Sequence, residues 1–164
     1  MPEVYIRPTQ LTDVESLRDA INGVAAEKWF LGTVTGFTLE QTREFVSKIV
    51  ERSIPQVVAI ESEKVVGWCD VLPGTMAGTS HVGRLGMGLL SQWRGRGLGR
   101  RLMNECIALA RRVGIEKVEL EVYGDNVAAL KLYKAYGFKQ EGVRLRARRY
   151  EGREQDIVMM ALWV

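Results

Sequence analysis

The chain has 164 residues, of which 46% are hydrophobic and 26% charged, and its formal net charge is +3. These values are typical of one globular domain spanning residues 1–164, and the absence of an 18-residue apolar run excludes a transmembrane helix. The mild positive charge permits an anionic ligand without demanding nucleic acid. Residues 1–5 lack the basic and apolar regions of a signal peptide, and Cys69 and Cys106 lie in apolar patterns typical of buried free thiols. These features favour a cytoplasmic protein without a membrane partner.

The first half of the chain predicts a strand, two helices and a hairpin. Residues 4–7 form a short strand that Pro8 ends. Capping boxes that begin at Thr12 and Thr38, each a Thr followed three residues later by Glu or Gln, open the two helices. The connection between these helices is rich in aromatic residues and glycines, which is typical of a satellite core or the lip of a pocket. Two β-branched runs, 56–61 and 64–72, predict the hairpin.

The second half predicts strands alternating with helices. A strand at 82–90 leads through a glycine-rich turn into an amphipathic helix at 98–113. The remaining predicted elements are a strand at 117–123, a helix at 126–136 capped by Asn126 and stopped by Gly137, and strands at 138–150 and 155–164. This order predicts an α+β domain with a twisted, mixed but mostly antiparallel sheet of about six or seven strands and about four helices.

The glycine-rich turn has the properties of an anion site. A helix N-terminus leaves about four backbone N–H groups unpaired and carries a partial positive charge. Glycines let an anion approach the backbone closely. The predicted site, suited to a pyrophosphate, comprises Arg94, Gly95, Arg96, Gly97, Leu98, Gly99 and Arg100. Neither a Walker loop nor a G-x-G-x-x-G dinucleotide fingerprint fits this spacing.

Two motifs carry a resemblance to a known family. The pattern [RQ]-x-x-G-x-[GA], filled by Arg94, Gly97 and Gly99, resembles the acyl-CoA pyrophosphate loop of the GCN-related N-acetyltransferases, the GNAT family. Residues 126–138 fit N-x-x-A-x-x-L-Y-x-x-x-G-F, which resembles the last signature block of that family. The two blocks stand in register, and the order of the other elements also matches, so the resemblance spans the chain.

The resemblance implies an enzyme that binds acetyl-CoA as cosubstrate and needs no metal. The family fold has a V-shaped opening between the strands 82–90 and 117–123, which receives the pantetheine arm. By resemblance, the backbone contacts to this arm fall at Met87, Gly88 and Leu89. Asn126 and Tyr133 lie two helical turns apart on one face, so one can contact pantetheine while the other reaches the thiol.

The resemblance also assigns the chemistry. Tyr133 corresponds to a family tyrosine that donates a proton to the leaving thiolate, and a core tyrosine is the alternative. Glu121 is placed like a glutamate that serves as base in some members, including ribosomal-protein alanine acetyltransferases, although a solvated strand face also explains it. His81, the only histidine, precedes its strand at the end away from the anion loop, which favours a surface role.

The acceptor is predicted from two features near the expected acceptor site. The helix connection carries Trp29, Phe30 and Phe37, which form either a pocket wall or a satellite cluster. Arginines recur with period two at Arg144, Arg146 and Arg148, so they share one face if the strand is regular. A solvated edge strand also explains them. The sharper interpretation is that Arg144 binds a carboxylate, which suggests a small primary amine such as an amino acid, acetylated by direct attack in a ternary complex.

The sequence is compatible with three functions. Beside a small-molecule acetyltransferase, the acceptor could be a protein N-terminus or lysine. A third option, of another class, is a non-catalytic module that binds CoA or nucleic acid. The aromatic residues of a base-stacking platform are not interleaved with the arginines, so no nucleic-acid partner is expected. The sequence leaves the oligomeric state open, with a homodimer as one option.

Overall fold

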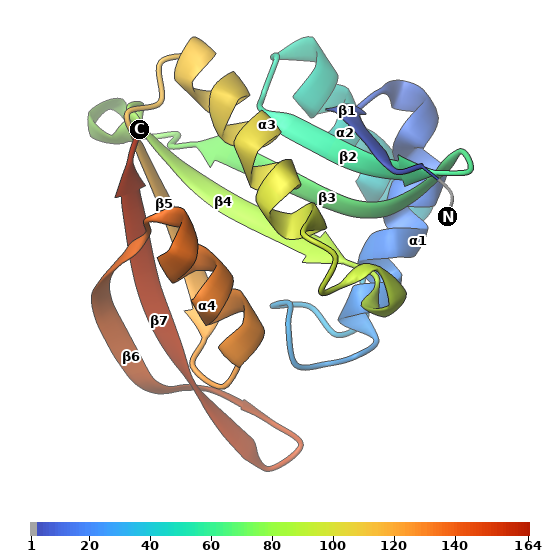
Figure 1. Ribbon diagram of the computed structural model, residues 1–164. Helices are drawn as coiled ribbons and strands as arrows, with labels where there is room; N and C mark the ends of the chain where they lie inside the picture. Colours follow the sequence, from blue (N-terminus) through green and yellow to red (C-terminus); the bar gives the residue numbers. More distant parts are fainter. Residues whose placement is uncertain (1–2) are drawn as a thin grey trace.

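The computed structural model describes residues 3–164 and shows one seven-stranded sheet with helices on both faces (Figure 1). The strands, in the spatial order β1-β2-β3-β4-β5-β7-β6, are β1 (Tyr5–Pro8), β2 (Gln56–Glu61), β3 (Lys64–Pro73), β4 (Val82–Leu89), β5 (Lys117–Tyr123), β6 (Lys139–Tyr150) and β7 (Arg153–Trp163). The helices are α1 (Val14–Ala25), α2 (Leu39–Glu51), α3 (Leu98–Arg112) and α4 (Val127–Tyr136). Among the described residues only β4 and β5 pair in parallel, so the predicted α+β class with a mixed, mostly antiparallel sheet is confirmed.

Two hydrophobic cores form because strand side chains alternate between the faces of the sheet. In β3, Trp68 points to the core under α1 and α2, which includes Leu17 and Val58. Cys69 points to the opposite core under α3 and α4. Cys106 on α3 is also fully buried there, so both cysteines are buried free thiols, as predicted.

The strands β4 and β5 separate soon after they meet. Their parallel ladder runs only from Val82 opposite Lys117 to Arg84 opposite Glu119. Beyond it, β4 stays paired with β3 up to Leu89, and β5 stays paired with β7 to its end. The edge of β4 that faces β5 is therefore unpaired from residue 85 onward, and the V-shaped opening expected from the resemblance is present (Figure 1).

The capping prediction is right for α2 and wrong for α1. Thr38 and Gln41 exchange the two expected hydrogen bonds, at 3.2 and 2.9 Å. Thr12 instead lies within a 3₁₀ turn, and α1 begins only at Val14. The capping box belongs to this 3₁₀ turn instead: the Asp13 carboxylate accepts the backbone N–H of Gln10, the N-cap of the turn, at 2.7 Å, and the Asp13 side chain makes no capping hydrogen bond to α1. Pro8, expected to end the first strand, is the last residue of β1.

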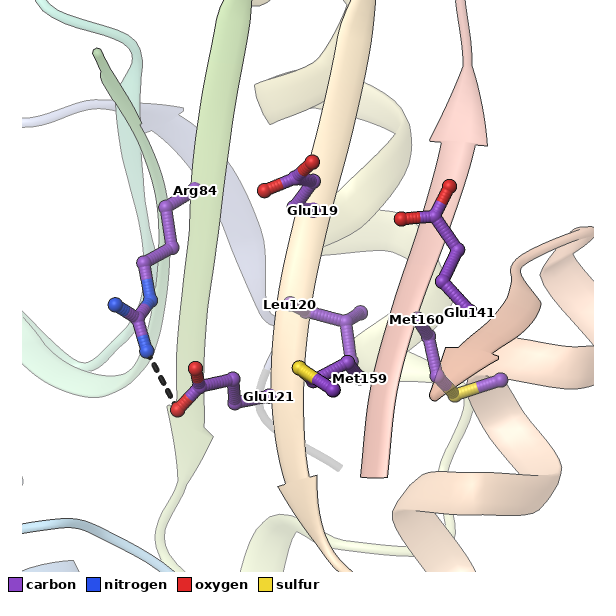
Figure 2. A pocket seen from close by; sticks show the side chains of 7 residues that line it. All are labelled: Arg84, Glu119, Leu120, Glu121, Glu141, Met159 and Met160. Carbon is purple, nitrogen blue, oxygen red and sulfur yellow. Dashed lines mark ion pairs between the residues drawn. The ribbon is translucent and has the colours of Figure 1, made fainter. Parts of the chain in front are cut away.

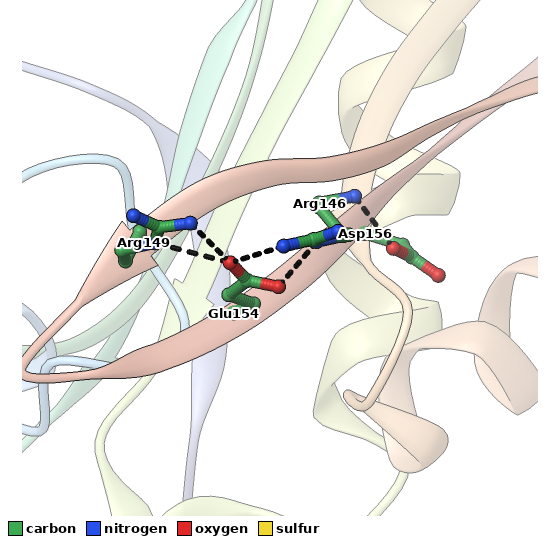
Figure 3. A network of polar contacts seen from close by, with 4 residues as sticks. All are labelled: Arg146, Arg149, Glu154 and Asp156. Carbon is green, nitrogen blue, oxygen red and sulfur yellow. Dashed lines mark hydrogen bonds and ion pairs between the residues drawn. The ribbon is translucent and has the colours of Figure 1, made fainter.

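The predicted single face of arginines on β6 is wrong. The register of β6 against β7 shifts between Arg144 and Arg148, and Arg146 adopts a left-handed backbone with a φ of 51°. Its N–H donates to Asp156 and its guanidinium pairs with Glu154 (Figure 3). A bulge breaks the alternation of side chains, so the three arginines reach three different surroundings.

Candidate active site

The anion loop joins β4 to α3 through two glycines with open space beside them. Gly97 is the N-cap of α3, with a φ of 77°, and Gly95 has a φ of 72°. A Cβ at either position would meet no atom within 4 Å. Gly99 differs, since a Cβ there would lie 2.9 Å from Leu132 and 3.3 Å from Met87. Two glycines therefore expose the backbone to an anion, while Gly99 lets α3 pack against α4 and β4.

The arginines of the loop have distinct partners. Arg94 donates two hydrogen bonds to Glu27, at 2.8 and 2.6 Å, and one to the Leu89 carbonyl at 2.9 Å. Its guanidinium also lies 4.8 Å from the centre of the Phe30 ring. Arg94 thus ties the loop to the α1–α2 connection. The exposed side chains that remain to meet an anion are Arg96, stacked on Trp93, and Arg100, stacked on Tyr136.

The predicted pantetheine contacts lie along the free edge of β4. Met87, Gly88 and Leu89 are half-buried and pair with β3 on one side only. Their position beside the opening leaves backbone groups for an extended ligand arm, as an added strand would use them. Leu98 is buried, so its backbone rather than its side chain is the part available to an anion.

Helix α4 carries both predicted residues, Asn126 as its N-cap and Tyr133 in the core on the α3 side of the sheet. The Asn126 side-chain oxygen caps the helix by accepting the Ala129 N–H at 3.2 Å. Tyr133 is 7% exposed and packs edge to face against Phe138, with ring centres 5.8 Å apart. Within residues 3–164 no group hydrogen-bonds its hydroxyl. Burial raises the pKa of Tyr133, so the hydroxyl stays protonated and available as a donor.

Glu121 lies on the opposite face of the sheet, in an open pocket of about 340 Å³ (Figure 2). The pocket is lined by Arg84, Glu119, Leu120, Glu121, Glu141, Met159 and Met160. Glu121 forms ion pairs with Arg84 at 2.7 Å and with Arg144. Arg144, which was predicted to bind the carboxylate of a substrate, therefore pairs with Glu121, the predicted base.

The three predicted acceptor aromatics do not form one wall. Phe30 stacks on Arg94, and Phe37 is 45% exposed with its N–H bonded to Asn22 at 2.8 Å. Trp29 lies instead against the β6–β7 hairpin, with its ring centre 6.1 Å from that of Tyr150. The α1–α2 connection therefore touches both the anion loop and the hairpin, through different aromatic residues.

Arg148 holds that hairpin against the connection, an interaction that sequence reasoning missed. Its guanidinium lies 4.9 to 5.8 Å from the ring centres of Tyr123, Tyr150 and Trp29. It also donates to the Lys28 carbonyl at 2.6 Å. The bulge at Arg146 turns Arg148 toward these rings, and period-two spacing gives no sign of that bulge. We call this group of four side chains and the Lys28 carbonyl the clasp.

Among residues 3–164, no group of three or more His, Cys, Asp or Glu side chains could hold a metal ion. No helix in the same range is long and apolar enough to cross a membrane.

Known proteins resemble this chain in sequence and in fold. The L-amino acid N-acetyltransferase AaaT of Escherichia coli (strain K12) is 28% identical over 163 residues, covering 98% of both chains. The N-alpha-acetyltransferase RimI of Mycobacterium tuberculosis is 40% identical over 90 residues, covering 48% of this chain and 55% of RimI. A crystal structure of a GNAT-family acetyltransferase from Streptococcus pneumoniae superposes with a TM-score of 0.91 at 27% identity, over 99% of this chain and 100% of that one. Residues 25–138, more than half of the chain, match the acetyltransferase (GNAT) family, and the chain therefore belongs to that family of acyltransferases.

Proposed function

We propose that this enzyme transfers the acetyl group of acetyl-CoA to the primary amine of a small molecule, such as an amino acid, by direct attack in a ternary complex. The separation of β4 from β5 beyond Arg84 carries this proposal. Tyr133 lies in the core on one face of the sheet, and the charged pocket around Glu121 lies on the other face. A thioester in the opening would be reached by an amine from one side and by a proton donor from the other.

Acetyl-CoA fits the residues that surround the opening. Its pyrophosphate would lie on the backbone of Gly95 and Gly97 and at the N-terminus of α3, where the helix dipole favours an anion. Arg96 and Arg100 supply mobile positive charge beside it. The pantetheine arm would pair with residues 87–89 of β4, with Asn126 as a further contact.

The chemistry needs a neutral amine, a stabilised oxyanion and a protonated leaving group. A backbone N–H near residues 87–89 on the free edge of β4 can donate to the oxyanion. The Tyr133 hydroxyl, which has no protein partner in the described range, can protonate the departing thiolate. The role of base that the resemblance gives to Glu121 stays a prediction.

A small amine that bears a carboxylate suits the charged pocket. Arg84 and Arg144 flank Glu121, so one guanidinium can exchange Glu121 for a substrate carboxylate while Glu121 attracts the ammonium group. The full-length similarity to AaaT, an L-amino acid N-acetyltransferase by name, supports the same class. The partial similarity to RimI, an N-alpha-acetyltransferase by name, favours a protein N-terminus as the second candidate.

A screen of L-amino acids against their decarboxylated amines and against short peptides tests this proposal. We expect the amino acids to have the highest kcat/KM. Equal kcat/KM for amino acids and decarboxylated amines would show that the enzyme does not bind the substrate carboxylate. Turnover of peptides alone would favour the second candidate.

If Glu121 is the base, as the resemblance implies, replacing Glu121→Gln lowers kcat/KM mainly at low pH, where most of the acceptor amine is protonated and needs a base. The measurement is a pH–rate profile with acceptor below its KM. Glu119→Gln is the matched control, because Glu119 is on the same strand face but pairs with Lys117 at 2.8 Å. A Glu121→Gln profile that coincides with wild type would show that another group takes the proton.

Replacing Arg148→Met is expected to raise the KM for the acceptor roughly 10-fold, since cation–π contacts and a charged hydrogen bond of the clasp are each worth about 1 kcal/mol or more. The affinity for acetyl-CoA should stay the same, because Arg148 itself contacts Trp29, Tyr123, Tyr150 and Lys28 and not the anion loop. Arg149→Met is the control, since Arg149 is exposed and pairs with Glu154 alone. Equal acceptor KM values for the two variants would show that the clasp does not shape the acceptor site.

A further inference from the structure

Two glycines leave part of the β4 face under α1 and α2 without side chains. Gly86 and Gly88 stand opposite Asp70 and Trp68 of β3. A Cβ at Gly88 would collide with the Trp68 ring, and a Cβ at Gly86 would lie 3.2 Å from Asp70 Oδ1. The missing side chains let both β3 residues lean over β4. The Asp70 carboxylate thus lies beside Gly86, two residues beyond Arg84, where β4 has just separated from β5.

Asp70 is an acid without a cationic partner. It is 8% exposed, and its one hydrogen bond within residues 3–164 comes from the Gln56 amide of β2 at 3.3 Å. Arg84, on the same face of β4, is engaged by Glu121, and no residue of α1 or α2 hydrogen-bonds Asp70. Burial raises the pKa of Asp70 to about 7, and the bond from Gln56 opposes this shift. Glu121 and Asp70 therefore differ in their partners: Glu121 is held by two guanidinium groups, and Asp70 by none within residues 3–164.

We propose that Asp70 accepts the proton that the acceptor's ammonium group must lose before it attacks acetyl-CoA. The proposal deepens the proposed function and rests on it. One N–H bond of the ammonium breaks, the proton passes to a carboxylate oxygen of Asp70, and the electron pair stays on nitrogen. That pair forms the C–N bond as the C–S bond breaks, and the sulfur takes a proton from the Tyr133 hydroxyl.

The amide nitrogen loses its second proton, which restores the Tyr133 hydroxyl through solvent, and Asp70 releases its own proton to solvent. The sum is an amide, the CoA thiol and one free proton. A buried site favours the first step, because an ammonium–carboxylate pair becomes a neutral amine and a neutral acid, which cost less to desolvate.

The central test is the pH dependence of kcat/KM for the isosteric variant Asp70→Asn. We expect kcat/KM near neutral pH to fall roughly 100-fold, the usual contribution of general base catalysis, with acetyl-CoA affinity unchanged. In Asp70→Asn the acidic limb should then follow the ionisation of the acceptor amine alone. Cys69→Ala is the control, since Cys69 neighbours Asp70 but points to the opposite core, and its profile should keep the limb.

A second variant keeps the proposal testable if Asp70→Asn fails to fold. Gln56→Met removes the hydrogen bond that lowers the pKa of Asp70, so the acidic limb should move to higher pH. A wild-type profile for either Asp70→Asn or Gln56→Met, or loss of the limb in Glu121→Gln alone, would overturn the proposal.

Stability supplies a readout that does not depend on turnover. A carboxyl group whose pKa is raised by folding binds its proton more tightly in the folded state, so stability falls as pH rises between about pH 4 and pH 7. Asp70→Asn should lack that fall and have a higher urea midpoint than wild type near pH 8. If the stability difference appears but wild type acetylates no amine, the proposed function fails; if wild type acetylates amines but Asp70→Asn behaves as wild type, only the role of Asp70 fails.

Discussion

Replacing Tyr133→Phe is expected to lower kcat roughly 100-fold, because the thiolate would leave without its proton donor. Acetyl-CoA affinity should change little, since the ring and its packing against Phe138 remain. Stability should also hold, because the hydroxyl gives up no hydrogen bond within the described residues. Steady-state kinetics at several pH values, with calorimetry for acetyl-CoA, provide the measurement.

Tyr136→Phe is the matched control for this prediction. Tyr136 lies on the same helix and also contacts Phe138, but it is more exposed and stacks under Arg100. Its variant should keep a kcat close to that of wild type. If Tyr133→Phe also turned over at the wild-type rate across the pH range, Tyr133 would be a packing residue only.

Replacing Gly97→Val is expected to abolish acetyl-CoA binding in calorimetry. A branched side chain would occupy the open space in which the pyrophosphate meets the backbone, and a left-handed φ of 77° disfavours a β-branched residue. Gly114→Val separates these two effects. Gly114 has a φ of 88° and equally open surroundings but follows the far end of α3, so its variant should bind acetyl-CoA normally. Normal acetyl-CoA binding by folded Gly97→Val would show that the loop does not bind the cofactor.

The fold was predictable because its signals are local. The alternation in 117–123, the helical periodicity of 98–113 and the cap at Asn126 each depend on residues close together in the chain. The glycine loop and the block 126–138 then placed these elements within a family whose fold the structure shares.

The contacts of the candidate site were less predictable because they join distant residues. Arg94 pairs with Glu27 and Arg148 reaches Lys28, across 67 and 120 positions of sequence. The period-two spacing within β6 wrongly predicted a single face of arginines, because the bulge at Arg146 changes the direction of the side chains that follow it. Asp70 did leave a signal, as a single acid inside the apolar run 65–72, but its position beside Gly86 needed the register of β3 and β4.

Thiol release from acetyl-CoA, measured with purified protein across a panel of amino acids, other amines, peptides and RNA, tests the central claim most directly. The proposed function predicts release that depends on the presence of a small amine and is matched by formation of its N-acetyl product. Binding of acetyl-CoA or RNA without amine-dependent release would contradict it and would indicate a non-catalytic binding module.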